Sequence, residues 1–365
     1  MKIKNVFDKI FSMENLYAAY EDSIKGRRYN ADILEYGADV WSNLTELRDR
    51  ILSGKYEIDK YHIFYIREPK KRMIMSIGFE HRIVQWAIYR IINPMLIKGY
   101  IKDSYGCIPG RGGLRAMKRL KGWTEKVNRK PGKWYYLKLD ISKYFYRVSH
   151  KILKEILAKK IKDNRLLEII YGIIDCKHTP FGLPVGKSPG DVPIKERLFD
   201  VGMPIGNLLS QMFANIYLNE LDQFCKRTLG IKRYIRYMDD MIILSNDKKQ
   251  LHSWKQTIGD FLNVRLELQL NRKTCIRPVS QGIEFVGYKI RGMRVTLRKS
   301  TTLRMKRSLR GVRMRFRYFR LSLKRVTETF VSYLGMLKHT DSEALTKRLY
   351  ELMVLTHTSA GKAYA

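Results

Sequence analysis

Two adjacent aspartates, Asp239 and Asp240, stand between two short runs of β-branched, aromatic and other apolar residues. Such runs favour a β-hairpin with the acids at its tip. Neighbouring carboxylates flanked by residues that favour burial repel each other and lose hydration, so they need a counter-charge. A divalent cation is the usual counter-charge, although an ordinary solvated Asp-Asp turn would have the same local pattern.

A third aspartate, Asp140, lies at the end of a run of strand formers at 134–141. The carboxyl end of a buried strand is a familiar place for a metal ligand. It is also a familiar place for the N-cap of a helix, which residues 142–148 would begin. The local pattern leaves both interpretations open. Phe145 follows closely, where its ring would stand over whatever Asp140 binds.

The net charge of the protein indicates which class of molecule it binds. The 365 residues include 71 Lys and Arg against 35 Asp and Glu, a net charge of +36, and 45% are hydrophobic. A folded protein with this excess is expected to bind a polyanion, nucleic acid first. We find no apolar run near ~20 residues and no N-terminal signal, so we expect a cytoplasmic protein without membrane contact. Four cysteines without a C-x-x-C pair predict reduced thiols.

Basic residues gather in two further places. A cluster at 67–72, including Lys71 and Arg72, opens an expected strand and suits a phosphate site, although an edge strand protected by cations would look the same. Residues 298–325 hold twelve Lys and Arg and no acid. We expect one amphipathic helix there, whose cationic face contacts nucleic acid. That face would consist of Lys306, Arg310, Arg313, Arg317, Arg320 and Lys324.

Taken in order, Asp140, the hairpin Tyr237-Met238-Asp239-Asp240 and the later basic helix resemble a reverse transcriptase. The resemblance runs from about residue 60 to 340. It also rests on the Gly-rich turn at 106–113, on Ile205-Gly206-x-x-x-Ser210-Gln211, on Lys273 and on Phe285-Val286-Gly287.

The resemblance implies an α+β, right-hand polymerase fold, with fingers and palm made of antiparallel sheet plus helices and a C-terminal helical, basic thumb. The expected divisions are an N-terminal helical extension at 1–60, fingers at 61–136, a palm at 137–290 with an insertion at 177–202, and a thumb and tail at 291–365. Only four acids follow residue 297, so we expect no RNase H, endonuclease or zinc domain.

Extending a primer requires a lower pKa of its 3′ hydroxyl and stabilisation of the charge that develops on the phosphates. Two Mg²⁺ ions do both, and Mn²⁺ is a substitute. We expect Asp140 and Asp239 to bridge the ions, with the Ile141 carbonyl as a further ligand and Asp240 as a supporting charge. By resemblance, Lys273 would protonate the leaving pyrophosphate; a phosphate-binding or merely exposed lysine is the alternative.

The resemblance also assigns the substrate contacts. Arg72, helped by Lys71, would grip the triphosphate of a dNTP, and Phe145 would be the steric gate against a 2′ hydroxyl. The nucleotide segment would include Ile205, Gly206 and Gln211. Phe285, Val286 and Gly287 would form the primer grip, and the basic helix would follow the backbone of the RNA–cDNA hybrid.

Ile205 departs from the glutamine that retroviral and group II intron enzymes usually carry, and Ser210-Gln211 replaces their Ser-Pro. This departure resembles the bacterial and phage reverse transcriptases of diversity-generating retroelements, which perform mutagenic retrohoming with errors at template adenines. That subfamily implies template RNA and a small, basic, oligomeric accessory variability protein as partners. The alternatives are a retron or group II intron-like enzyme, and a non-catalytic RNA-binding or defence protein on the same scaffold.

Overall fold

The computed structural model describes residues 2–66 and 72–356. The chain divides into two compact units. The first contains residues 1–111, 138–241 and 252–274, and the second contains 112–137, 242–251 and 275–365. Each is described by itself. The proposed finger, palm and thumb boundaries remain predictions.

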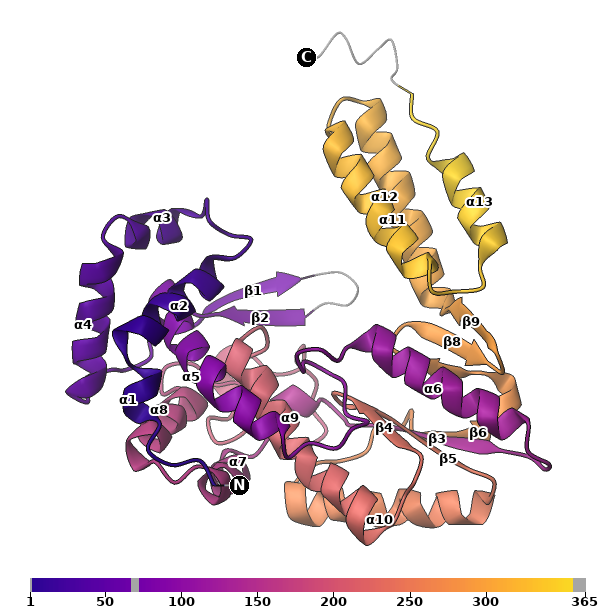
Figure 1. Ribbon diagram of the computed structural model, residues 1–365, viewed down its shortest axis with the longest axis horizontal. Helices are drawn as coiled ribbons and strands as arrows, with labels where there is room; N and C mark the ends of the chain where they lie inside the picture. The colour runs from indigo at the N-terminus through magenta and orange to yellow at the C-terminus, as the bar shows by residue number, and fades with distance from the viewer. Residues whose placement is uncertain (1, 67–71, 357–365) are drawn as a thin grey trace. The chain divides into compact units, whose positions relative to one another are not determined.

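The first unit begins with helices, as expected for residues 1–60. They are α1 (Phe7–Ile10), α2 (Met13–Ile24), α3 (Ala31–Gly37) and α4 (Val40–Leu52). The Ser12 hydroxyl caps α2 by accepting a hydrogen bond from the amide of Asn15. The Asn15 side chain then donates to the Ala87 carbonyl in α5 (Phe79–Ile97), against which α2 packs (Figure 1).

The expected strand pair follows. Strand β1 (His62–Ile66) pairs antiparallel with β2 (Arg72–Ser76), and Ile66 lies opposite Arg72. Along β2 the side chains alternate, with Met73 and Met75 buried and Arg72 exposed. Lys71 and the other residues of 67–71 lie outside the described part of the chain.

A four-stranded sheet carries the acidic hairpin. It has the order β4-β5-β3-β6, built from β4 (Tyr234–Tyr237), β5 (Asp240–Ser245), β3 (Tyr135–Asp140) and β6 (Cys275–Pro278). The hairpin with the two aspartates at its tip is therefore confirmed. In the first unit, α9 (Leu208–Gln223) is buried over nearly its whole surface, which explains its run of apolar residues on every face. Helix α10 (Lys248–Leu266) follows β5 and is longer than expected.

Residues 142–148 form only a short 3₁₀ turn, Tyr144–Tyr146, after Lys143 with a left-handed φ of 49°. Helices α7 (His150–Lys160) and α8 (Asn164–Asp175) follow. Beyond them, the insertion at 177–202 is irregular, as expected from its Gly and Pro content. It contains a 3₁₀ turn at Ile194–Glu196, and its arms meet at a bridge between Gly182 and Leu198.

The second unit contains α6 (Gly113–Asn128), which packs on β8 of a separate antiparallel sheet. That sheet has the order β7-β8-β9, with β7 (Ile283–Phe285), β8 (Tyr288–Arg291) and β9 (Arg294–Leu297). Strands β7 and β8 are joined by Val286 and Gly287, which have φ values of 44° and 88°. Two positive φ values are typical of a two-residue hairpin turn, and a β-branched residue rarely adopts one.

The expectation of a single basic helix across 306–324 is wrong. Helix α11 (Lys299–Arg317) ends before Phe319, whose φ is 55°, and Ser322 caps α12 (Leu323–Leu337). Arg320 therefore lies in the connection and Lys324 in the second helix. The apolar face of α11 packs as expected at Met305, Leu309 and Val312, and a third helix, α13 (Glu343–Leu352), lies alongside (Figure 1).

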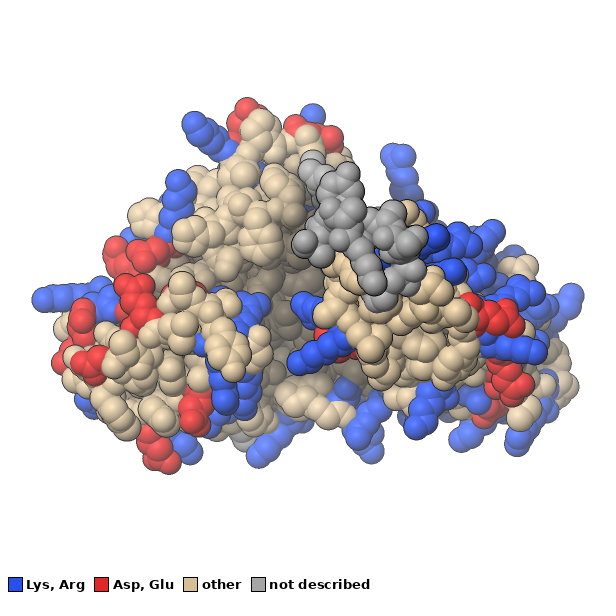
Figure 2. Space-filling view, turned by 90° about the horizontal axis from the view of Figure 1, so that it is seen from above, with Lys and Arg blue, Asp and Glu red and all other residues tan. Residues whose placement is uncertain are grey.

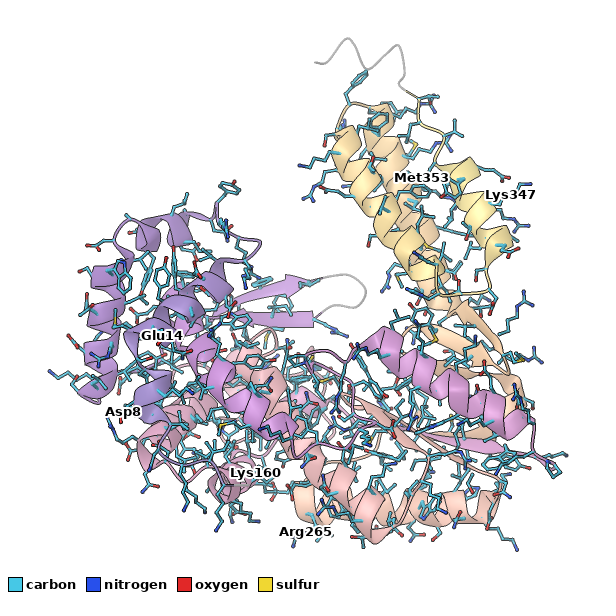
Figure 3. All side chains as sticks on the ribbon, viewed as in Figure 1. Asp8, Glu14, Lys160, Arg265, Lys347 and Met353 are labelled. Atoms are coloured by element: carbon cyan, nitrogen blue, oxygen red, sulfur yellow. The ribbon has the colours of Figure 1, made fainter. Side chains whose placement is uncertain are left out.

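The surface reflects the composition. Figure 2 shows Lys and Arg side chains spread over the face it presents, with acidic side chains in smaller groups between them. On α13, the exposed Lys347 points away from the helix (Figure 3). Within residues 2–66 and 72–356, we find no helix that combines the length and apolarity needed to cross a membrane.

The two arms of the insertion approach so closely that Gly182 leaves no room for a side chain. A Cβ there would lie 2.5 Å from the Val201 carbonyl oxygen, whereas a Cβ at Gly190 in the same insertion would meet nothing. We expect Gly182→Ala to lower the free energy of unfolding by about 1–3 kcal/mol, because backbone must shift. Urea unfolding measures this, and Gly190→Ala is the matched control. Equal stability of the two variants would contradict the close approach.

Candidate active site

The two-residue turn between β4 and β5 holds Asp239 at its tip. Met238 precedes it with a φ of 54°, an uncommon conformation for a residue with a side chain. Gly106 lies against this turn, and a Cβ there would be 2.6 Å from the Met238 amide nitrogen. The Gly-rich turn, expected from the sequence to approach an anion, thus makes room for the acidic hairpin at this glycine.

A buried arginine fixes the strand that leads into the turn. Arg236 and Asp222 are both 0% exposed, and the Arg236 Nε and Nη2 donate to the two Asp222 carboxylate oxygens at 2.8 and 2.7 Å. The Arg236 Nη1 donates to the Met238 carbonyl and to the Asn215 side chain, both at 3.1 Å. The Tyr234 hydroxyl also donates to Asp222, at 2.7 Å. The guanidinium thus links helix α9, strand β4 and the strained residue of the turn.

This bidentate ion pair is almost fully satisfied. Burial alone would lower the pKa of Arg236, but the charge and hydrogen bonds of Asp222 raise it, so the guanidinium stays protonated. The backbone adds to the same assembly, because the Arg236 amide donates to Asp103 and the Arg236 carbonyl accepts from Tyr105. Segments far apart in the chain therefore converge on the acidic turn.

The three aspartates act on one another electrostatically. Burial raises the pKa of Asp239, the Asp140 charge raises it further, and the charges of Arg72 and Arg236 oppose the rise. Burial raises the pKa of Asp240 to about 6 despite Lys138, and Asp140 and Asp239 contribute to that rise. Asp140 and Asp239, distant in sequence, therefore belong to one cluster of negative charge.

Asp240 forms an ion pair with a neighbouring strand residue. Its Oδ2 accepts a hydrogen bond from the Lys138 ammonium at 3.2 Å, while its Oδ1 is buried without a hydrogen-bond donor. Among the described residues, no three Asp, Glu, His or Cys side chains come close enough together to enclose a metal ion. The carboxylates of Asp140 and Asp239 are hard oxygen donors of the kind that Mg²⁺ prefers, and their role as its ligands remains a prediction.

The end of β3 is held by a segment that follows α10. The Asn271 amide donates to the Asp140 carbonyl at 2.7 Å, and the Ser142 amide donates to the Gln269 carbonyl at 2.8 Å. These bonds flank Ile141, whose side chain is buried. Lys273 follows in the same segment, with its amide bonded to the Asn271 side chain and its own side chain exposed.

The expected nucleotide-binding residues are joined through backbone contacts. The Met75 amide of β2 donates to the Ile205 carbonyl at 3.0 Å, and the Met203 amide donates to the Phe145 carbonyl at 2.7 Å. Gly206, with a φ of 115°, lies against Ile74, whose Cγ2 would be 3.0 Å from a Cβ there. Arg72, Phe145, Ile205 and Gly206 thus lie on segments that contact one another, and Gln211 lies in the first turn of α9.

Comparison with known families agrees with this arrangement. Residues 60–290 match the family model described as reverse transcriptase (RNA-dependent DNA polymerase). The chain belongs to the reverse transcriptase family. It is accordingly an RNA-directed DNA polymerase, and its mixture of helices and antiparallel strand pairs agrees with the expected polymerase fold.

Among curated relatives, Protein YkfC of Escherichia coli (strain K12) is 26% identical over 279 residues, which cover 67% of this chain and 70% of the relative. The group II intron-encoded protein LtrA of Lactococcus lactis subsp. cremoris is 24% identical over 368 residues. That match covers 82% of this chain but only 57% of LtrA. A putative COX1/OXI3 intron 2 protein of Saccharomyces cerevisiae is 21% identical over 277 residues, 60% of this chain and 30% of the relative.

Solved structures of telomerase also resemble the chain. Telomerase from Candida albicans, in complex with a fragment of telomeric RNA, has a TM-score of 0.47 at 13% identity, over 81% of this chain and 55% of that one. Apo telomerase from Candida tropicalis has a TM-score of 0.45 at 17% identity, over 71% of this chain and 60% of that one.

The remaining expected site residues lie in the second unit. Phe285 is buried at the end of β7, and Val286 and Gly287 form the tight turn after it. Of the basic residues, Arg313 donates to the Leu352 carbonyl and so helps to hold α13. Their roles at the primer and the hybrid backbone remain predictions.

Three residues around the aspartates were missed from the sequence. Arg236 and Asp222 carry the ion pair under the hairpin, and Lys138 pairs with Asp240. Arg236 interrupts an otherwise apolar strand, and a charge in such a strand requires a buried partner. That signal was present, but sequence alone does not say which of many acids the partner is.

We expect Arg236→Gln to lower the free energy of unfolding by roughly 3–5 kcal/mol, because it leaves Asp222 buried without its counter-charge. Denaturant unfolding followed by circular dichroism measures the loss. Arg265→Gln is the matched control, since Arg265 is exposed on α10 (Figure 3). If both substitutions cost the same, the ion pair does not stabilise the hairpin.

Proposed function

We propose that the chain copies RNA into DNA at a site whose metal-binding carboxylates are Asp140 and Asp239. The observation that carries this proposal is the family match over residues 60–290, which includes Asp140 and the β4–β5 hairpin that holds Asp239 next to Asp240. Asp140 and Asp239 would hold two Mg²⁺, joined by the Ile141 carbonyl, while Asp240 supports them from its ion pair with Lys138. Mn²⁺ would be a substitute.

When bound, the ions would lower the pKa of the primer hydroxyl and stabilise negative charge on the phosphates. In the reaction, the primer 3′ oxygen forms a bond to the α-phosphorus of a dNTP, and the bond from that phosphorus to pyrophosphate breaks. Lys273, exposed in the segment that binds Asp140 through Asn271, would give the pyrophosphate a proton. Arg72 would hold the triphosphate, because its guanidinium is exposed and lacks a carboxylate partner among the described residues.

Phe145 would select the sugar of the incoming nucleotide. The Met203 amide donates a hydrogen bond to the Phe145 carbonyl, which holds the backbone of this residue in place. A 2′ hydroxyl would then collide with the ring, which favours deoxynucleotides. Gly206 and Gln211 would complete the nucleotide segment, and Phe285, Val286 and Gly287 would hold the primer end.

We expect Asp239→Asn to lower the rate of DNA primer extension on an RNA template by on the order of 1,000-fold, about 4 kcal/mol in the barrier. The amide removes the charge that a bridging ligand supplies. Primer-extension assays with Mg²⁺ and with EDTA measure this rate. The control is Asp260→Asn, because Asp260 is an exposed acid on α10. Undiminished extension by the Asp239 variant would contradict the assignment.

We further propose that synthesis is error-prone at template adenines, as in diversity-generating retroelements. Supporting this, Ile205 presents an apolar side chain where retroviral and group II intron enzymes usually carry glutamine, and its carbonyl accepts a hydrogen bond from Met75 in β2, the strand that begins with Arg72. A site without that polar contact penalises a mismatch less. The partners would be template RNA, its cDNA hybrid and a small basic accessory variability protein, and the basic residues of α11 and α12 would follow the hybrid.

We expect Ile205→Gln to reduce misincorporation opposite adenine several-fold, since one regained hydrogen bond of about 1 kcal/mol would favour correct pairing. Sequencing of cDNA made on a defined RNA template gives the error frequency at each base. Ile205→Leu preserves the apolar character and should keep the wild-type error frequency. An unchanged frequency in the glutamine variant would count against the proposed cause of infidelity.

A group II intron-type role is the second candidate, favoured by the likeness to the intron-encoded protein LtrA. The two roles differ in their products. An intron-type enzyme would copy adenines with the same accuracy as other bases, so the sequencing above separates them.

A further inference from the structure

Two arginines are buried within the described part of the chain, and they differ in whether a carboxylate lies beside them. Arg236 is paired with Asp222, whereas Arg197, 4% exposed in the insertion, has no carboxylate within ion-pair distance among the described residues. Its Nη2 donates to the Pro189 carbonyl at 3.2 Å, and its Nε and Nη1 have no hydrogen-bond acceptor. A buried cation without a carboxylate partner among the described residues is costly, and its free N–H groups are suited to an anionic ligand.

The position of Arg197 is fixed by local structure. It follows the 3₁₀ turn Ile194–Glu196, and its amide donates to the Ile194 carbonyl. The next residue, Leu198, pairs with Gly182 through two backbone hydrogen bonds. The insertion is also tied to the segment after β3, because the Leu183 amide donates to the Tyr146 carbonyl. Arg197 is therefore held by backbone at both sides.

The neighbours of Arg197 place it on the nucleotide side of the candidate active site. Its guanidinium carbon lies 5.7 Å from the centre of the Tyr146 ring, and Tyr146 directly follows the expected gate residue Phe145. The charges of Arg197 and Arg72 both act on the Tyr146 hydroxyl, and Arg72 also acts on Asp239. The contact with Tyr146, and the hydrogen bond from Leu183 to the Tyr146 carbonyl, therefore place Arg197 next to the segment that follows β3.

The chemistry of this group suits a phosphate. Two guanidinium N–H groups without acceptors, a second arginine and a phenol offer donors and positive charge, a combination that matches phosphate oxygens. Two sources of phosphate reach a polymerase site: the triphosphate of the nucleotide and the backbone of the template strand. The nucleotide is favoured because Arg197 lies 5.7 Å from the ring of Tyr146, the neighbour of the expected gate residue Phe145, whose carbonyl accepts a hydrogen bond from Met203.

We propose that Arg197, together with Tyr146 and Arg72, binds a phosphate of the incoming dNTP and that the insertion at 177–202 exists in part to present it. This inference rests on the proposed polymerase site at Asp140 and Asp239. It assigns Arg197 a role in substrate binding and none in the bond-making step. The insertion accordingly becomes part of the nucleotide site.

The test compares Arg197→Gln and Arg197→Lys with Lys195→Gln, an exposed residue of the same 3₁₀ turn. Single-nucleotide incorporation on an RNA template gives the Kd for dNTP and the maximal rate separately. We expect Arg197→Gln to raise the Kd for dNTP about 10- to 100-fold, as lost hydrogen bonds to a charged group imply, with a smaller change in the maximal rate. Arg197→Lys should recover part of the affinity, and Lys195→Gln should match the wild type.

A second measurement does not depend on catalysis. Without ligand, Arg197→Gln should keep or raise the Tm, because it removes an uncompensated buried charge. Sodium tripolyphosphate should raise the Tm of the wild type and of Lys195→Gln but not of Arg197→Gln. A purely structural arginine would behave in the opposite way, with a lower Tm and an unchanged response to tripolyphosphate, and that result would overturn the proposal.

The remaining outcomes are also decisive. A higher Kd for template RNA with an unchanged Kd for dNTP would overturn the nucleotide assignment in favour of the template backbone. If the wild type fails to extend a primer, the proposed function fails. In that case the Tm shift caused by tripolyphosphate still tests the inference about Arg197. Loss of this Tm shift in Arg197→Gln alone would support the inference, and an unchanged Tm shift in Arg197→Gln would refute it.

Discussion

The candidate active site depends on the buried pair between Arg236 and Asp222. A reverse transcriptase must hold carboxylates of like charge together, and their repulsion and lost hydration oppose folding at that point. The ion pair offsets this cost by stabilising the hairpin. The Arg236 guanidinium donates a hydrogen bond to the carbonyl of Met238, which has a left-handed conformation. Because both partners are fully desolvated, neither can be removed without exposing the other to a costly environment.

The insertion at 177–202 adds a second constraint. It contains little regular structure, yet Gly182, Leu183, Leu198 and Gly202 all make backbone hydrogen bonds within it or to the segment after β3. An irregular segment fixed in this way can place a side chain as accurately as a strand does. Arg236 and Arg197 are both buried cations, but their roles differ. Arg236 pairs with Asp222 and stabilises the hairpin, whereas Arg197 is proposed to bind a phosphate.

Sequence predicted the parts of the fold that local chemistry determines. The hairpin at Asp239, the helical extension at 1–60 and the strand ending at Asp140 follow from apolar periodicity and from Asp in turns. The break between α11 and α12 was missed because the basic and apolar spacing continues through Phe319, while the stop depends on that residue's backbone and on the Ser322 cap. The partner of Arg236 and the surroundings of Arg197 were unpredictable, since they come from contacts between distant segments.

The hydrogen bond from Asn271 to the Asp140 carbonyl has a consequence for biosynthesis. Translation proceeds from the N-terminus, so Asp140, the hairpin and their buried ion pair all emerge from the ribosome before the segment that fixes the end of β3. A nascent chain that ends before Asn271 contains Asp140, Asp239 and Asp240 but lacks this hydrogen bond to the Asp140 carbonyl. The hydrogen-bonded end of β3 therefore forms only after Asn271 has been synthesised.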